Sequence, residues 1–316
     1  MSLRVLAPGP QTTVQDLGRE GWRHLGVARA GALDPRLAML ANRLVGNAAA
    51  AAVLEMTLQG PSLELVQPLR VALCGAVVAA RFEPAAGEPI PIPSGRPVDL
   101  PRGILHVGAL AGGARAWLAI AGGIDVAPVL GSRSTDLRGG FGGVEGRALQ
   151  RGDALPLGAA PALDCSAPRI PGWWIDPDFD VARDAPIRYR PASHAATALA
   201  ERRWRVGARS NRQGLRLEGD ALDALAGDGI SAAVAPGTIQ LPADGQPIVL
   251  LADAQTVGGY PRLGHVIAAD LPRLAQLRPG DALRFQACDA ETAARAACSW
   301  RARLARIELA IEERFT

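Results

Sequence analysis

Four short stretches of the sequence gather polar side chains among turn-forming glycines and prolines. They are GPQTTVQDLGREGWRHLGV (9–27), GSRSTDLRGGFGG (131–143), GARSNRQGLR (207–216) and DAQTVGGYPRLGH (253–265). Amides, hydroxyls and guanidinium groups in such turns often bond only to nearby backbone. Where a turn is rigid, the same groups can line a pocket for a small anionic or amide-containing molecule.

The fourth stretch directly follows the apolar run Ile248–Leu251. Pro261 fixes one φ angle, and the two glycines before Tyr260 let other backbone approach closely. Tyr260 and Arg262 are costly choices for a plain turn, because each buries apolar area while needing polar partners. An arginine here could hold a carboxylate or phosphate through two parallel hydrogen bonds. The stretch therefore predicts a stiff turn at the mouth of a pocket.

The composition excludes several kinds of chemistry. No lysine occurs among the 316 residues, which excludes a Walker A phosphate loop, a Schiff base and a lysine-attached biotin. The four histidines lack metal-ligand spacing, and no G-x-S-x-G elbow is present. A net charge of +3 gives no sign of a nucleic-acid-binding face. The residues alone therefore lead to a small-molecule site without an assigned reaction.

Short apolar runs must position these stretches. Glycine (36 residues) and proline (25 residues) separate runs such as SLELV, ILHVGAL and IVLLAD, a pattern typical of a mainly β barrel or sandwich. Asp34 is a suitable N-cap, and Pro35 a suitable first residue, for a helix ending near Gly46. A second helix starts near Asp289. Its apolar stripe comprises Ala297, Trp300, Leu304, Ile307 and Ile311.

The chain also repeats itself. LQRGDALPL (149–157) matches LRPGDALRF (277–285), and three weaker matches occur in the same order in both halves: VARAG with GARSN, GPSLEL with PGTIQL, and AWLAIAGG with PIVLLADA. An ordered series of matches indicates an ancient tandem duplication. We expect one β domain over 1–165, a linker over 166–186, and a second β domain with the terminal helix over 187–316. Gly152 and Gly280 should adopt positive φ in equivalent turns, with Asp153 and Asp281 bonding local backbone.

The cysteines and the N-terminus predict a cytoplasmic location. The cysteines are scattered and resemble reduced thiols rather than a disulfide framework; they are Cys74, Cys165, Cys288 and Cys298. The N-terminal MSLRVLAPGP lacks the apolar core of a signal peptide, and the apolar runs are too short to span a membrane. We therefore expect no membrane and no nucleic acid among the partners.

Three long motifs resemble the biotin-dependent carboxyltransferase family, also called allophanate hydrolase subunit 2. The first is GPQTTVQDLGREGWRHLGVARAGALDPRLAMLANRLVGN, the second AGGIDVAPVLGSRSTDLRGGFGG, and the third LPADGQPIVLLADAQTVGGYPRLGHVIAADLPRLAQLRPGD. Together the match runs from about Pro8 to Phe285. The resemblance implies two tandem cyclophilin-like β-barrel domains with a few helices, in agreement with the duplication.

The resemblance also implies partners and an activity. Members of the family pair with a B-type partner protein, and in many bacteria with an A-type partner protein as well, to form an ATP-dependent 5-oxoprolinase. That complex opens 5-oxoproline to glutamate, and the ATP could bind to one of the partners. Related chains form the carboxyltransferase part of urea carboxylase, and another relative antagonises a kinase inhibitor without catalysis. The motifs are common to all three, so the alternatives stay open.

The motif positions supply candidate site residues. The candidates for catalysis are His265, His24 and Tyr260, with either histidine as the proton shuttle. The candidates for substrate binding are Gln15, Asp16, Arg209, Asn211, Gln255, Thr256, Gly258, Gly259 and Arg262. Arg262 or Arg209 would meet anionic groups. Each of these residues could instead hold the barrel or an interface with a partner protein. We expect no metal site on this chain.

Overall fold

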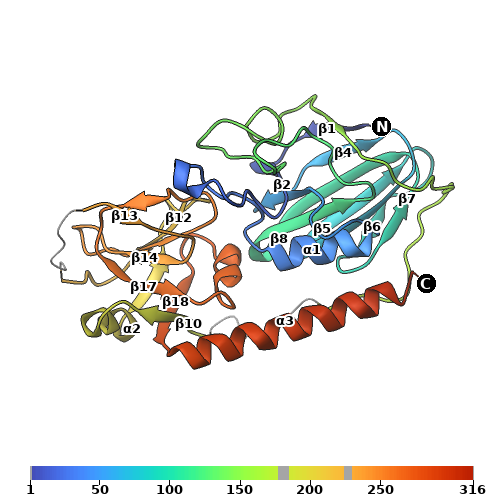
Figure 1. Ribbon diagram of the computed structural model, residues 1–316. Helices are drawn as coiled ribbons and strands as arrows, with labels where there is room; N and C mark the ends of the chain where they lie inside the picture. The colour runs from blue at the N-terminus through green and yellow to red at the C-terminus, as the bar shows by residue number, and fades with distance from the viewer. Residues whose placement is uncertain (1, 177–184, 224–229, 316) are drawn as a thin grey trace. The chain divides into compact units, whose positions relative to one another are not determined.

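The computed structural model describes residues 2–176, 185–223 and 230–315. The chain divides into two compact units (Figure 1). The first unit contains Met1–Arg19, Ala30–Pro177 and Ala305–Thr316, and the second contains Glu20–Arg29 and Asp178–Leu304. The domain boundaries expected from the sequence stay a prediction, and residues 177–184 of the expected linker lie outside the described residues.

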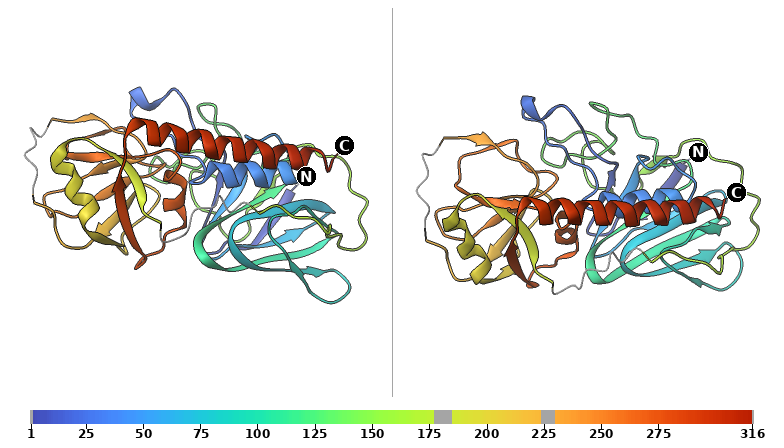
Figure 2. Two further views of the ribbon diagram at one scale, coloured as in Figure 1. Left: turned by 90° about the horizontal axis from the view of Figure 1, so that it is seen from below. Right: turned by 60° about the horizontal axis from the view of Figure 1, so that its bottom comes forward.

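The first unit is built on one sheet, which has nine strands within the described residues. These are β1 (Ser2–Ala7), β2 (Gln11–Gln15), β3 (Val53–Thr57), β4 (Ser62–Leu65), β5 (Leu69–Pro84), β6 (Ile90–Ile92), β7 (Val98–Leu100), β8 (Gly103–Ile120) and β9 (Ala154–Pro156). The order is β2-β3-β8-β4-β1-β9, and β5 pairs with β6, β7 and β8. Figure 2 shows β5 and β8 as long, paired strands. Their alternating apolar residues fill the core of this unit.

Helix α1 (Pro35–Leu44) packs against β5 and β8. Asp34 Oδ1 accepts hydrogen bonds from the backbone N–H groups of Arg36 (3.0 Å) and Leu37 (3.4 Å), so the N-cap expected from the sequence is confirmed. The same carboxylate also binds the Arg36 guanidinium in a buried pair. Helix, cap and ion pair together fix the C-terminal part of the first motif.

The second unit forms a closed barrel of seven strands within the described residues, in the order β10-β17-β14-β15-β12-β11-β18. The barrel strands are β10 (Ile187–Pro191), β11 (Arg203–Val206), β12 (Gly214–Glu218), β14 (Thr238–Gln240), β15 (Ile248–Leu250), β17 (Arg262–Val266) and β18 (Ala282–Ala287). A two-stranded ladder of β13 (Ala232–Ala233) and β16 (Val257–Gly258) accompanies it. The short helices are η1 (Arg23–Leu25), η2 (His194–Thr197), α2 (Ala198–Glu201) and η3 (Leu271–Gln276).

Two aromatic residues anchor the barrel core. Trp204 and Tyr189 are fully buried, and the rings of Tyr189 and Phe285 meet edge to face with their centroids 5.8 Å apart. Each polar tip has a partner: Tyr189 Oη donates to Ala196 O (2.8 Å) and Trp204 Nε1 to Leu199 O (3.1 Å). These bonds attach η2 and α2 to the barrel.

The Gly-Asp turns of the internal repeat have the same construction in both units. Gly152 has φ 92° and Gly280 has φ 90°, as predicted. Asp153 Oδ2 accepts from Gln150 N, and Asp281 Oδ2 accepts from Arg278 N, each at 2.8 Å. Both turns also exchange two backbone hydrogen bonds with one valine of a neighbouring strand, Val5 in the first unit and Val206 in the second. The turn chemistry inferred from the sequence is therefore confirmed.

Helix α3 (Ala290–Glu312) is a single long helix near the end of the chain (Figures 1 and 2). Leu304 and Ile311 are buried, and Ala297, Trp300 and Ile307 are partly buried. The predicted stripe is thus confirmed, and so is the mainly β fold with a C-terminal amphipathic helix. Within the described residues no helix is long and apolar enough to cross a membrane.

Candidate functional site

The end of β2 places Asp16 at the centre of a dense hydrogen-bond cluster in the first unit. Asp16 Oδ1 accepts from Ser132 Oγ (2.6 Å), Ser134 Oγ (2.6 Å) and Gly18 N (2.8 Å), and Oδ2 accepts from Arg133 N (2.6 Å). Four donors thus surround one carboxylate that is only 9% exposed. Hydroxyl and backbone N–H donors thus satisfy both oxygens of this buried carboxylate.

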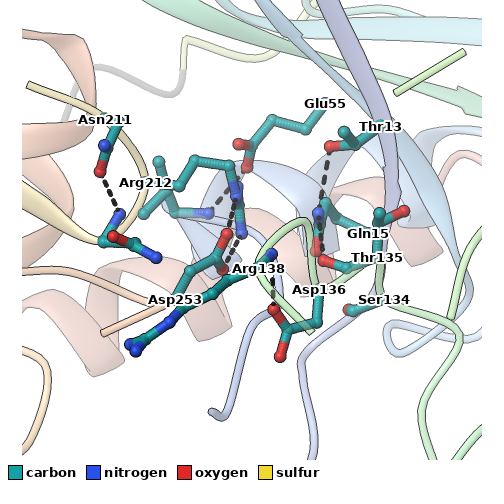
Figure 3. Close-up of polar contacts among 12 residues, drawn as sticks. Thr13, Gln15, Glu55, Ser134, Thr135, Asp136, Arg138, Asn211, Arg212 and Asp253 are labelled. Carbon is teal, nitrogen blue, oxygen red and sulfur yellow. Dashed lines mark hydrogen bonds and ion pairs between the residues drawn. The ribbon is translucent and has the colours of Figure 1, made fainter. Parts of the chain in front are cut away.

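Gln15 joins the first motif to the second from the other side of the strand end. Its Nε2 donates to Thr13 Oγ1 (3.0 Å) and Thr135 O (3.2 Å), and its Oε1 accepts from Gly31 N (3.1 Å). Figure 3 shows Gln15 between Thr13 and Thr135. Because Gln15 is fully buried and bonded at both ends of its carboxamide, it holds two loops together.

Arg19 completes the first cluster. Its buried guanidinium lies over the Phe141 ring, 4.7 Å from the centroid, and donates to Val129 O (3.3 Å) and to Ser134 O. Gly142 lies beside these groups with φ 73°, and a Cβ there would come within 2.2 Å of Ser134 O. The glycine of the second motif is therefore required by packing and by backbone conformation.

The third and fourth stretches meet in the second unit through a buried ion pair. Arg212 Nε and Nη2 donate to the two oxygens of Asp253 at 2.8 Å and 2.9 Å, and Asp253 N donates to Arg212 O at 3.0 Å. Arg212 and Asp253 face one another in Figure 3, and both side chains are buried. The bidentate geometry fixes the start of the fourth stretch relative to the loop before β12.

The rest of the fourth stretch differs from the predicted turn. Val257–Gly258 is a strand, β16, which pairs with β13, and the bond from Val234 N to Thr256 O (2.9 Å) extends this ladder. Gln255 Nε2 donates to Gln240 Oε1 over 3.4 Å, so the stretch also bonds to barrel strand β14. Backbone pairing, in addition to Pro261, thus gives this segment its rigidity.

The predicted catalytic side chains are accessible. Tyr260 is 52% exposed, His24 lies exposed on η1, and His265 lies exposed on β17. His265 Nδ1 is 3.5 Å from Thr238 Oγ1, and partial burial lowers the pKa of its imidazole from the ordinary value. A neutral imidazole near pH 7 can accept a proton, as a proton shuttle requires.

The substrate-binding candidates fall into distinct environments. Gln15 and Asp16 belong to the first unit, and the other seven substrate-binding candidates belong to the second. Thr256 is buried, Gln255 and Gly258 are partly buried, and Gly259 and Arg262 are exposed. Arg209 is exposed, and Asn211 Oδ1 accepts from Gln213 N (2.8 Å) to shape the loop before Arg212. Within the second unit, Thr256 and Gly258 lie on the β13–β16 ladder, and Gln255 directly precedes them.

Four residues that hold these stretches together were not candidates from the sequence: Arg212, Asp253, Ser132 and Ser134. All four occur in the polar stretches, so their types were visible in the sequence. Their contacts join residues that are 41 to 118 positions apart, and these contacts were not visible in the sequence. Within the described residues, no group of three or more His, Cys, Asp or Glu is arranged to hold a metal ion.

The segments described above are also those that this chain shares with known proteins. The family model described as "Carboxyltransferase domain, subdomain A and B" matches residues 25–287, which include α1, the Asp16 partners in the second motif and the whole β13–β16 ladder. The chain belongs to this carboxyltransferase-domain family. The family expected from the three motifs is therefore confirmed.

Two kinds of relatives share the carboxyltransferase domain. The chain is 39% identical over 298 residues to the C subunit of the Escherichia coli 5-oxoprolinase, covering 93% of this chain and 94% of that protein. It is 33% identical over 313 residues to the urea amidolyase of Lachancea kluyveri, covering 90% of this chain but 17% of that protein. The first similarity extends over nearly the whole of both chains, whereas the second is to one part of a much longer protein.

Solved structures of the carboxyltransferase-domain family have the same fold. The Kluyveromyces lactis urea carboxylase superposes with a TM-score of 0.85 at 30% identity, over 97% of this chain and 29% of that one. The Kluyveromyces lactis urea amidolyase gives a TM-score of 0.83 at 30% identity, over 97% of this chain and 20% of that one. This chain therefore spans less than a third of the length of either protein.

Proposed function

We propose that this chain acts as the C subunit of a 5-oxoprolinase and helps convert 5-oxoproline to glutamate. One observation carries the proposal: the similarity to the C subunit of the Escherichia coli enzyme covers 93% of this chain and 94% of that protein. The similarity to urea amidolyases instead corresponds to a small fraction of their length. The reaction would be shared with a B-type partner protein and an A-type partner protein in the cytoplasm.

The chemistry suits the residues of the second unit. A lactam resists hydrolysis because amide resonance stabilises its ground state, and phosphorylation of its oxygen by ATP would make the carbon electrophilic. The site then needs donors for the developing charge and a cation for the substrate carboxylate. Arginines, carboxamides and His265 of the second unit provide groups of these types. A chain without lysine has no Walker A loop, so we assign ATP binding to a partner protein.

Carboxyl transfer is the second candidate function. Its support is the 33% identity to the Lachancea kluyveri urea amidolyase over 90% of this chain. Such a reaction would need biotin on another protein, since this chain has no lysine to carry it. A non-catalytic role as a binding antagonist of a B-type protein is the third reading, and it predicts no turnover from any combination of the partners.

The test is reconstitution. The chain is co-expressed with the A-type and B-type proteins of the same organism, and glutamate and ADP are followed from 5-oxoproline. We expect both products at equal rates, and loss of both when this chain is omitted. Unchanged turnover without the chain would refute the proposal. Carboxylation of urea by a mixture containing carboxybiotin, with no glutamate from 5-oxoproline, would favour the second candidate.

A further inference from the structure

Two buried nitrogen donors of the second unit have no hydrogen-bond partner among the described residues. They are Arg23 Nη1 and Gln240 Nε2. A buried donor without an acceptor destabilises the fold, and more so when it is charged, so native proteins rarely retain one without a use. Both donors lie next to the same β13–β16 ladder, so we consider them as parts of one site.

Arg23 approaches the ladder from η1. Its Nη2 donates to Val234 O, and Val234 N in turn donates to Thr256 O at 2.9 Å. The guanidinium is thereby fixed next to the backbone of the fourth stretch, with its second nitrogen buried. This places a cation at the segment that holds Gln255, Thr256 and Gly258.

Arg23 forms no ion pair within the described residues. Glu20, whose negative charge acts on Arg23, forms its own ion pair with Arg29 at 2.9 Å. Burial and the neighbouring Arg29 lower the pKa of Arg23 from its ordinary value, and Glu20 offsets this only in part. A partly buried guanidinium next to a second arginine is stabilised by an incoming anion, and a carboxylate fits its planar donor fork.

Gln240 reaches the ladder from the barrel. The pairing register between β14 and β17 shifts between Ile239 and Gln240. Such an irregularity changes the direction in which the Gln240 side chain points. Its Oε1 accepts from Gln255 Nε2, while its Nε2 lies under Gly258, where a Cβ would come within 2.5 Å. A side chain at 258 would clash with this carboxamide, so only glycine leaves its Nε2 free of a side chain at this point, and Gln240 is buried at 1% exposure.

We propose that Arg23 and Gln240 form a two-point recognition site for a small molecule that carries both a carboxylate and an amide carbonyl. Arg23 binds the carboxylate, and Gln240 Nε2 donates to the carbonyl oxygen. A lactam with a ring carboxylate presents both groups, so this inference rests on the proposed function and adds to it the residues that select the substrate. Neither residue was a candidate from the sequence.

The test uses two fragments that each carry half of the recognised chemistry. Tetrahydrofuran-2-carboxylate has the carboxylate without the lactam, and 2-pyrrolidinone has the lactam without the carboxylate. Dissociation constants of both are measured by ligand-observed NMR on the full chain co-purified with its partners, for the wild type, Arg23→Met and Gln240→Leu. Arg205→Met is the matched control, because this exposed arginine also donates to a backbone carbonyl, Gly280 O at 3.2 Å.

We expect a crossed pattern. Arg23→Met should weaken binding of the carboxylate fragment about 10-fold or more and change binding of 2-pyrrolidinone by less than about threefold, since a hydrogen bond to a charged group contributes about 1.5–3 kcal/mol. Gln240→Leu should weaken binding of 2-pyrrolidinone and leave the carboxylate fragment unchanged. Arg23→Lys should retain part of the carboxylate affinity, and Arg205→Met should match the wild type.

Equal losses for both fragments in either variant, or no binding of either fragment to the wild type, would overturn the two-point site. Thermal unfolding of each variant separates a misfolded chain from a missing contact. The measurement needs no turnover, so its failure can be told apart from failure of the proposed function. A wild-type complex that binds both fragments in the crossed pattern yet releases no glutamate from 5-oxoproline would retain this inference and remove that function.

Discussion

Asp16 and Gln15 in the first unit differ in one respect from Arg23 and Gln240, which lie next to the β13–β16 ladder. Asp16 accepts four hydrogen bonds from its own unit, and Gln15 beside it is bonded at both ends of its carboxamide. Arg23 and Gln240 each retain a buried donor without a partner among the described residues. Asp16 and Gln15 therefore have the partners that a role in folding requires, whereas Arg23 and Gln240 each have a donor that a bound molecule can pair.

The Arg212–Asp253 pair belongs to the first kind although it lies in the second unit. Replacing Arg212 by Leu leaves the Asp253 carboxylate buried without its partner. We expect this to reduce the free energy of unfolding by about 3–5 kcal/mol, as measured by urea denaturation. The exposed Arg216→Leu is the control and should change it by well under about 1 kcal/mol.

The double variant Arg212→Leu with Asp253→Leu tests whether the loss in the single variant comes from the unpaired carboxylate. It removes both charges, so it should recover much of the stability lost by the single variant. A single variant as stable as the wild type would show that the pair does not hold the fourth stretch in place.

Asp16→Asn is the next largest change. The new amide nitrogen must meet at least one of the four donors, so we expect a loss of about 1–3 kcal/mol in unfolding free energy. The KM of the folded complex for 5-oxoproline should stay unchanged. Asp125→Asn is the matched control, because this exposed carboxylate pairs with Arg133 of the same loop.

The opposite outcome for Asp16→Asn would contradict the structural role given to Asp16. If Asp16→Asn raised KM for 5-oxoproline tenfold or more while the unfolding curve stayed the same, Asp16 would be a substrate ligand. The substrate-binding role expected from the sequence would then hold.

The two Gly-Asp turns predict the smallest effect. Arg147 donates hydrogen bonds to both carboxylate oxygens of Asp153 (2.8 Å and 3.0 Å) and holds the pKa of that carboxyl below its ordinary value. Because the folded-state pKa is lowered, the contribution to stability is present near neutral pH and is lost as the pH falls through the folded-state value.

Asp153→Asn should therefore destabilise the chain by about 1 kcal/mol or less at pH 7, since the pair is partly exposed, and the difference should vanish in acid. Asp281→Asn in the equivalent, exposed turn is the control and should cost less. Unfolding free energies between pH 7 and about pH 2 give the comparison. A deficit for Asp153→Asn that persists in acid would exclude the carboxylate charge as its cause.

Local chemistry allowed much of the fold to be predicted from the sequence. The Asp34 cap, the two Gly-Asp turns and the apolar stripe of α3 depend on neighbours a few residues apart, so they could be read directly. The family and the four polar stretches were also recognisable. Burial and hydrogen-bond partners could not be predicted, because they depend on contacts between distant segments.

Gln240 illustrates that limit. In the sequence it is one polar residue in the strand-like run GTIQLP. Its importance comes from a register shift against β17, a bond to Gln255 and the absence of a side chain at Gly258. Arg23 likewise becomes a candidate only through its hydrogen bond to Val234 O, more than two hundred residues away in the sequence.

A structure of the assembled complex with 5-oxoproline bound is the most direct test of the two-point site. We expect the substrate carboxylate at hydrogen-bond distance from Arg23 Nη1 and the ring carbonyl oxygen at hydrogen-bond distance from Gln240 Nε2, with the Asp16 cluster unchanged. A substrate held by Asp16 and Gln15, with Arg23 and Gln240 bonded only to protein atoms, would contradict it.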